Sequence, residues 1–270
     1  MNDIFQNAII VAAHPDDEIL WFSSIIEKVK QVVICYVLQE SKPEWTAGRV
    51  QALSKYPLGN MHTLNFHLSD VFNCGDWKYP LSTPYGIHLS RNGCHRDLYE
   101  SNYLKLKNEF KVMLRPYQHV FTHNPWGEYG HEEHVQLFRV IQELQSQLGF
   151  TLWVSNYVSN HSIYLYLESV RMMDEYFFRL PTNKKRAAQI RDLYKECGCW
   201  TWYPDFQWCD EDVFLRIDLS QSNKRRIGKS YPLNFIDVDE VGTPNLFIKK
   251  TDRIVQLMCR FRNRYFSPKK

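Results

Sequence analysis

Two segments of the sequence combine histidines with carboxylates at spacings that suit a metal ion. The first reads His-Pro-Asp-Asp-Glu over residues 14–18, and the second contains His131 and His134, three positions apart on one side of an expected helix. A catalytic zinc ion takes three protein ligands from His, Asp or Glu and keeps one coordination position open for water. Two histidines and one carboxylate from these segments would make such a set.

The second aspartate of the first segment supplies the chemistry of this hypothesis. With Asp17 as the ligand, Asp16 remains free beside the metal to take a proton from water and pass it to a leaving amine. A histidine that is not needed as a ligand can stabilise the oxyanion of a tetrahedral amide carbon. Spacing alone leaves open which aspartate and which histidine bind the metal.

Other interpretations of the same residues remain open. Two histidines and one carboxylate also form the facial triad of non-haem iron oxygenases, so Fe²⁺ is an alternative to Zn²⁺. A catalytically silent carbohydrate-binding protein is a third class. Taken singly, paired acids in a first helical turn often only complement the helix dipole. Two such clusters near strand ends favour a site, because carboxylates placed there need partners.

Each segment follows directly on a short apolar run. Residues 8–13 and residues 119–123 are expected to be buried strands of a parallel sheet. In open α/β sheets, ligands bind at the carboxyl ends of the strands. If these two strands are neighbours in the sheet, both segments face one cleft.

The rest of the chain continues this alternation of strands and helices, which predicts parallel crossover units and an α/β fold. Residues 67–97 lack a clear period and are expected to form a long loop. The further strands are expected over residues 32–38, 61–66, 151–158 and 162–170. The helices are expected from His14-Pro15 to about Lys28 and over residues 47–56, 99–114, 131–148 and 184–196.

Composition narrows the class of protein. The chain has 270 residues and a formal charge of +3, enough for one large domain and too small a charge to indicate nucleic-acid binding. We expect no signal peptide, because the acids at 16–18 interrupt the first apolar run, and no membrane span, because no apolar stretch approaches the required length. Seven cysteines without a CxxC pair argue against a disulfide framework and for a reducing, cytoplasmic location.

The C-terminal part is expected to be an extension, residues 201–270, packed on a main domain of residues 1–200. From Ile254 onwards, apolar residues recur at helical spacing while several arginines lie off that line, which indicates a basic amphipathic helix. Such a helix is expected to dock on the core, with a peripheral contact to an anionic membrane surface as the alternative.

The block Ala-His-Pro-Asp-Asp-Glu at residues 13–18, with Gly-Glu-Tyr-Gly-His-Glu-Glu-His at 127–134, resembles the LmbE-like, or PIG-L, family of zinc-dependent N-acetylglucosaminyl deacetylases. The likeness covers roughly the first 150 residues, and the helix at 183–196 is a fainter match. It implies a Rossmann-like α/β fold, a mostly parallel sheet flanked by helices. It also implies a metal-dependent amidohydrolase that acts on a small N-acetylated sugar or glycoconjugate.

The resemblance further implies roles for individual residues. Zinc would be bound by His14, Asp17 and His134. Asp16 would act as general base and then as general acid, and His131 would stabilise the oxyanion.

Three further roles are implied at the rim of the site. Tyr129 would help to polarise the substrate carbonyl, while Arg49 and Asp70 would contact the substrate. The sequence departs from the family pattern in three places: Asn124 replaces an aspartate, Glu-Glu at 132–133 replaces Pro-Asp between the paired histidines, and the acidic residue usual around Arg49 is missing. None of these is an expected ligand, so the departures bear on substrate identity and not on the reaction type.

Overall fold

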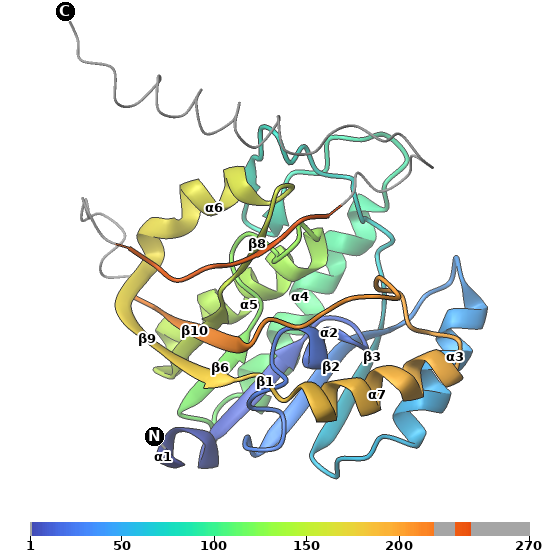
Figure 1. The fold of residues 1–270 in the computed structure, drawn as a ribbon. Helices are drawn as coiled ribbons and strands as arrows, with labels where there is room; N and C mark the ends of the chain where they lie inside the picture. Colours follow the sequence, from blue (N-terminus) through green and yellow to red (C-terminus); the bar gives the residue numbers. More distant parts are fainter. Residues whose placement is uncertain (1, 219–229, 239–270) are drawn as a thin grey trace, which may run out of the picture. The chain divides into compact units, whose positions relative to one another are not determined.

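The computed structural model describes residues 2–218 and 230–238. A seven-stranded, mostly parallel sheet with helices on both faces forms the centre of this part of the chain (Figure 1), which confirms the expected Rossmann-like α/β fold. The basic helix expected from Ile254 lies outside the described residues. No helix within the described ranges is long and apolar enough to cross a membrane.

The strand order of the sheet places the two motif segments side by side. The order is β3-β2-β1-β6-β7-β10-β9, in which the first five strands are parallel and β10 is antiparallel to both of its neighbours. The chain reverses its direction of travel across the sheet between β1 and β6, so a crevice opens at their carboxyl ends. The strands of this sheet are β1 (Ala8–Ala12), β2 (Gln31–Leu38), β3 (Met61–His67), β6 (His119–Thr122), β7 (Thr151–Ser155), β9 (Met173–Pro181) and β10 (Glu211–Ile217).

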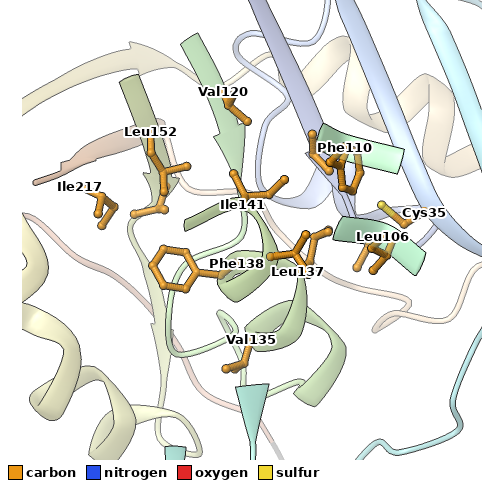
Figure 2. Close-up of a cluster of buried hydrophobic side chains, with 14 of the residues drawn as sticks. Cys35, Leu106, Phe110, Val120, Val135, Leu137, Phe138, Ile141, Leu152 and Ile217 are labelled. Atoms are coloured by element: carbon orange, nitrogen blue, oxygen red, sulfur yellow. The ribbon is translucent and has the colours of Figure 1, made fainter. Parts of the chain in front are cut away.

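The central strands are buried on both faces, as their continuous apolar sequences predict. Along β1, Ile9 and Val11 belong to one hydrophobic cluster and Ile10 to another, because successive side chains point to opposite faces. Figure 2 shows the first cluster, in which Leu137 and Ile141 of one helix pack beneath the sheet. Within residues 2–218 and 230–238, the helices of eight or more residues are α3 (Pro43–Ser54), α4 (Arg96–Met113), α5 (Glu132–Leu148) and α7 (Lys184–Glu196).

The first crossover helix is much shorter than expected. The helix predicted to reach Lys28 ends at Leu20, as α2 (Asp17–Leu20), and turns follow. The Ser24 N–H donates to the Asp212 carboxylate at 2.9 Å and the Ser23 hydroxyl contacts the same carboxylate at 3.3 Å. A distant acid therefore takes the backbone donor that a continuing helix would use. The other short helices are α1 (Asn2–Gln6), α6 (Ile163–Ser169) and the 3₁₀ turn η1 (Val170–Met172).

The strand predicted over residues 162–170 is wrong, because the segment forms α6. Its buried positions are Ser162, Leu165, Tyr166 and Ser169, which is helical spacing. Two of these four buried residues are serines, so the apolar residues alone do not show the helical spacing. The aliphatic residues of the segment alternate instead, which is typical of a strand. The Ser162 hydroxyl is buried because it donates to a backbone carbonyl at 2.6 Å.

The sheet extends further along the chain than predicted. The strand expected over residues 151–158 divides into β7 and β8 (Tyr157–Ser159), and β8 pairs in parallel with β11 (Asn234–Ile236). Strands β9 and β10 were not predicted. Since β10 lies beyond residue 200, part of the expected C-terminal extension belongs to the central sheet itself.

The long loop expected over residues 67–97 contains a small hairpin of β4 (Ser82–Thr83) and β5 (Gly86–Ile87). It also contains a disulfide between Cys74 and Cys94, a correction to the expectation drawn from the cysteine count. The free cysteines among the described residues are Cys35, Cys197, Cys199 and Cys209.

The disulfide should stabilise this loop measurably. It links residues 20 positions apart. Closing a loop of that size lowers the conformational entropy of the unfolded chain, which raises the free energy of unfolding by about 3 kcal/mol. The double variant Cys74→Ser/Cys94→Ser is therefore expected to lose about 3 kcal/mol of unfolding free energy in urea titrations. Cys209→Ser, which removes a free thiol, serves as the control. An unchanged urea midpoint in the double variant would contradict the prediction.

Candidate metal centre

The chain turns sharply after β1 and carries the first acidic segment into the crevice. Asp16 has a φ of 108°, a left-handed conformation that Asp and Asn tolerate better than most residues. Its N–H donates to the Glu18 carboxylate at 2.9 Å, and the His14 N–H donates to Asp17 Oδ2 at 2.7 Å. The turn therefore fixes His14, Asp16 and Asp17 within one short stretch of backbone.

The chain after β6 forms a tight loop that directs Glu128 inwards. Gly127 has a φ of 67°, and a Cβ there would lie 2.6 Å from the His131 carbonyl oxygen, so only glycine fits without a shift. The Asn124 side-chain oxygen accepts a hydrogen bond from the Glu128 N–H at 2.9 Å. Helix α5 begins after this loop with His131 as its N-cap residue.

Three side-chain atoms converge between the two segments. His14 Nδ1 lies 3.2 Å from Asp17 Oδ2, Asp17 Oδ2 lies 3.2 Å from His134 Nε2, and the two nitrogens are 3.3 Å apart. Zinc bonds of about 2.0–2.2 Å in tetrahedral geometry place such ligand atoms about 3.3–3.5 Å apart. The spacing of these atoms therefore fits one face of a zinc tetrahedron.

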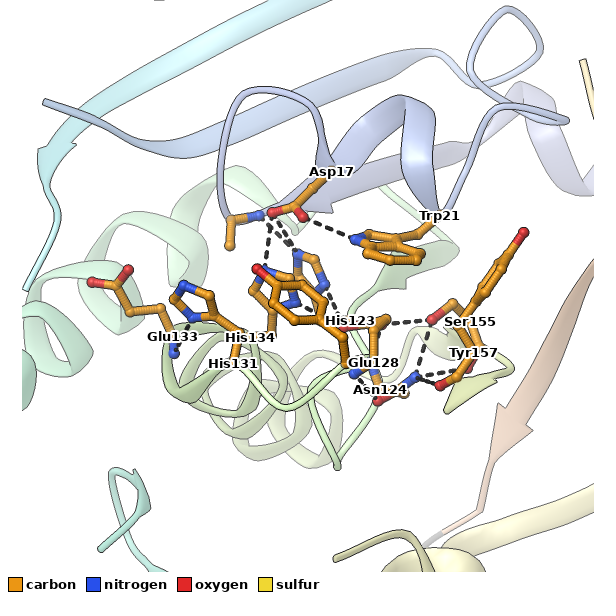
Figure 3. A network of polar contacts seen from close by, with 12 residues as sticks. Asp17, Trp21, His123, Asn124, Glu128, His131, Glu133, His134, Ser155 and Tyr157 are labelled. Carbon is orange, nitrogen blue, oxygen red and sulfur yellow. Dashed lines mark hydrogen bonds and ion pairs between the residues drawn. The ribbon is translucent and has the colours of Figure 1, made fainter. Parts of the chain in front are cut away.

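Buried carboxylates hold the outer nitrogens of both imidazoles. His14 Nε2 is 2.7 Å from Glu133 Oε2, and His134 Nδ1 is 2.9 Å from Glu128 Oε2, as Figure 3 shows for the second pair. A carboxylate that accepts the outer N–H leaves the inner nitrogen deprotonated and aimed at the metal position. Both histidines thus have the hydrogen-bonding pattern typical of zinc ligands.

A fourth histidine, His123, lies against the same cluster but has both nitrogens in use. Its Nε2 accepts the Ala13 N–H at 2.9 Å, and its Nδ1 lies 2.9 Å from the Glu128 carboxylate. Two groups of potential ligands are drawn together among the described residues: His14, His131 and His134, and Asp17, His123 and His134. The His123 lone pair is already bound to a backbone donor, and His131 Nδ1 accepts the Glu133 N–H, which leaves a proton on its Nε2. The set of His14, Asp17 and His134 therefore fits a metal better.

His131 lies beside the cluster with a free donor. Its Nδ1 accepts the Glu133 N–H at 3.2 Å, so its proton is on Nε2. Burial, followed by the neighbouring His14, holds the pKa of His131 well below its usual value of 6.5, so the ring is neutral. Its centroid is 4.6 Å from that of His14. A neutral imidazole N–H is therefore available for an anionic oxygen near the metal position.

Asp16 is a buried carboxylate beside the cluster. Burial and the charge of Asp17 raise the pKa of Asp16 to about 7. Its Oδ2 accepts a hydrogen bond from the Thr201 hydroxyl at 2.9 Å. A carboxyl with this pKa can both accept and donate a proton near neutral pH.

The three residues expected at the rim have different surroundings. The Tyr129 ring lies 5.4 Å from the His134 ring and 4.5 Å from the Trp202 ring. Arg49, on α3, is buried, its charge acts on Asp16, and its Nε and Nη1 have no hydrogen-bond partner among the described residues. Asp70 instead accepts a hydrogen bond from the Gln39 side chain at 2.7 Å. The structure therefore brings Tyr129 and Arg49 to the cluster, whereas the contact of Asp70 is with Gln39.

The supporting residues were not predicted from the sequence. The sequence contains Glu128 and Glu133 in addition to the acid needed as a ligand. Their partners depend on how the two segments meet, so the sequence does not identify them. Glu132 has another task, because its carboxylate accepts the Gly75 N–H at 2.7 Å and the Trp77 indole N–H at 3.1 Å. It ties the loop of residues 67–97 to the start of α5. No local pattern marked Thr201.

Comparisons with known proteins support the fold. No family model matches the chain. An uncharacterized protein of Acanthamoeba polyphaga mimivirus is 24% identical over 180 residues, which is 63% of this chain and 69% of that protein. Among solved structures, the zinc-inhibited form of a teicoplanin deacetylase has a TM-score of 0.52 at 9% identity and covers 78% of this chain and 97% of its own. At that identity, the likeness establishes a shared fold alone.

Proposed function

We propose that this chain is a zinc-dependent hydrolase that removes an N-acetyl group from an amino sugar or a related acetylated amine. The observation that carries the proposal is the convergence of His14, Asp17 and His134, with ligand atoms 3.2–3.3 Å apart and both outer nitrogens held by buried carboxylates. A zinc ion in such a site lowers the pKa of water to about 7 and polarises the substrate carbonyl.

The residues around this position match the steps of amide hydrolysis. Asp16 takes a proton as water adds to the acetyl carbon, and the His131 N–H donates a hydrogen bond to the oxyanion that forms. The C–N bond then breaks, and Asp16 returns the proton to the departing nitrogen. Acetate and a free amine are the products.

Two rim residues suit substrate binding in this scheme. The unpaired donors of buried Arg49 would be satisfied by hydroxyl or carbonyl oxygens of a substrate. Tyr129, whose ring centroid is 5.4 Å from that of His134, would contact the acyl group of the substrate. Asp70 would contact the substrate from beside the site, since the N–H of its neighbour Ser69 donates to Glu133 at 2.6 Å. The fold shared with a teicoplanin deacetylase supports the same reaction class.

The direct test is acetate release by the purified, zinc-loaded chain from a panel of N-acetylated amino sugars. The reactions are run with and without oxygen and are repeated with the Fe²⁺-loaded chain. Acetate release without oxygen supports the hydrolase. Oxygen-dependent turnover with Fe²⁺ would instead identify an oxygenase using the same ligands, and a chain that binds no metal would indicate a silent binding protein.

Glu128 should control metal affinity without touching the metal. One of its carboxylate oxygens accepts from both His123 and His134 at 2.9 Å, and the other accepts from Ser155. Glu128→Gln places an N–H₂ group against groups that also donate, so it should weaken zinc binding about 10- to 100-fold in a chelator competition titration. Glu143→Gln, on the far part of α5, is the control. Equal zinc affinity in both variants would remove Glu128 from this role.

A further inference from the structure

Thr201 reaches the candidate site from a distant part of the chain. Its hydroxyl donates to Asp16 Oδ2 at 2.9 Å across 185 sequence positions. No other described group donates a hydrogen bond to either oxygen of this carboxylate. The orientation of the carboxylate of Asp16 therefore depends on a single side-chain donor.

The segment that carries Thr201 is held firmly although Thr201 itself is exposed. The Trp202 ring packs edge-on against Tyr129, with centroids 4.5 Å apart, and against Trp21 at 5.7 Å. Further on, the Trp208 indole N–H donates to the Ile19 carbonyl at 2.8 Å. These aromatic anchors fix the position of the Thr201 hydroxyl relative to α2.

The backbone of Asp16 is fixed separately from its side chain. Glu18 accepts the Asp16 N–H with one oxygen, while its other oxygen accepts from Tyr56 at 2.9 Å and Tyr194 at 2.8 Å. The carboxylate can still rotate about its side-chain torsions. The guanidinium of Arg49 acts on Asp16 through its charge and has two donors without a partner among the described residues, so it would attract the carboxylate if the Thr201 hydrogen bond were lost.

We propose that Thr201 is a positioning residue that keeps the carboxylate of Asp16 directed at the reacting water and away from Arg49. The inference rests on the proposed function, in which Asp16 moves the proton. It assigns a role to the segment after α7, which no motif identified. Small displacements of a catalytic group are enough to cost about 100-fold in rate, so one hydroxyl can matter greatly.

The kinetic test compares three variants of the zinc-loaded full chain with N-acetylglucosamine as the probe substrate. Thr201→Val keeps the shape but removes the donor, and it should lower kcat about 10- to 100-fold with KM and zinc content nearly unchanged. Thr201→Ser restores the hydroxyl and should remain within about twofold of wild type. Thr182→Val removes a comparable Thr-to-Asp hydrogen bond outside the site and is the matched control.

Several results would overturn the role of Thr201. These are a wild-type kcat in Thr201→Val, an equal loss in Thr201→Ser, or a change confined to KM or zinc content. Crystal structures of wild type and Thr201→Val supply a test that needs no turnover. The carboxylate of Asp16 should rotate toward Arg49 in the variant, and an unmoved carboxylate refutes the inference even if the substrate is something else. Wild-type protein that hydrolyses no acetylated amine would instead overturn the proposed function.

Discussion

Replacing Asp16 by asparagine is expected to lower the rate of acetate release by about 10²–10⁴-fold while leaving the zinc content unchanged. The expected loss is this large because an amide cannot take a proton from the attacking water. Asparagine is the right substitute at this position, because the φ of 108° is better tolerated by Asn than by Ala. Its side-chain oxygen can still accept from Thr201, so the local geometry is preserved.

The comparison is made at saturating zinc, with metal content measured on the same samples. Asp76→Asn, an exposed aspartate in the loop of residues 67–97, is the control for a lost carboxylate. If Asp16→Asn turned over substrate at a rate close to wild type, the proton would have to move through another group, and the mechanism would be wrong.

Replacing His134 by alanine is expected to abolish activity by removing the metal. A structural zinc site of four ligands binds with about 10–16 kcal/mol, so each ligand contributes roughly 2.5–4 kcal/mol. Losing one ligand should weaken zinc binding by about 10²–10³-fold, and Glu128 would be left with one fewer donor. Elemental analysis after dialysis against a weak chelator measures the loss.

The matched control is His62→Ala, which removes an exposed histidine from β3. It should retain zinc and activity. A His134→Ala protein that is folded and still holds one equivalent of zinc after dialysis would show that the ion binds elsewhere, and the ligand set of His14, Asp17 and His134 would then be abandoned.

The strands and helices that the sequence predicts correctly are those with a clear short-range pattern of apolar residues. Strands such as β1 and β2 are continuous apolar runs, and burial on both faces of a parallel sheet requires that pattern. The early end of α2 and the helix α6 were missed for a different reason. In both places serine side chains or backbone make buried hydrogen bonds to distant residues, and these contacts outweigh local propensity.

The candidate site likewise contains residues that local motifs identify and residues that only long-range contacts identify. Spacing indicates a metal site made from the two segments, and the family resemblance implies His14, Asp17 and His134 as its ligands. The structure brings the ligand atoms of these three residues together. Glu133 could not be assigned to His14, because the two residues lie 119 positions apart and meet only when β1 and β6 pair. Thr201 is an extreme case, since a lone exposed threonine carries no local signal.

The order of strands at the far edge of the sheet has a consequence for how the protein is made. Strand β10 lies between β7 and β9, yet it is the last of the three to leave the ribosome. Until β10 is synthesised, β9 has no neighbour in the sheet. Phe178 of β9, which is buried in the folded protein, then remains exposed to solvent. Unpaired apolar strands promote aggregation during folding. A nascent chain stalled before β10 should therefore depend on chaperones, and stop codons in this region should yield insoluble product rather than a smaller enzyme.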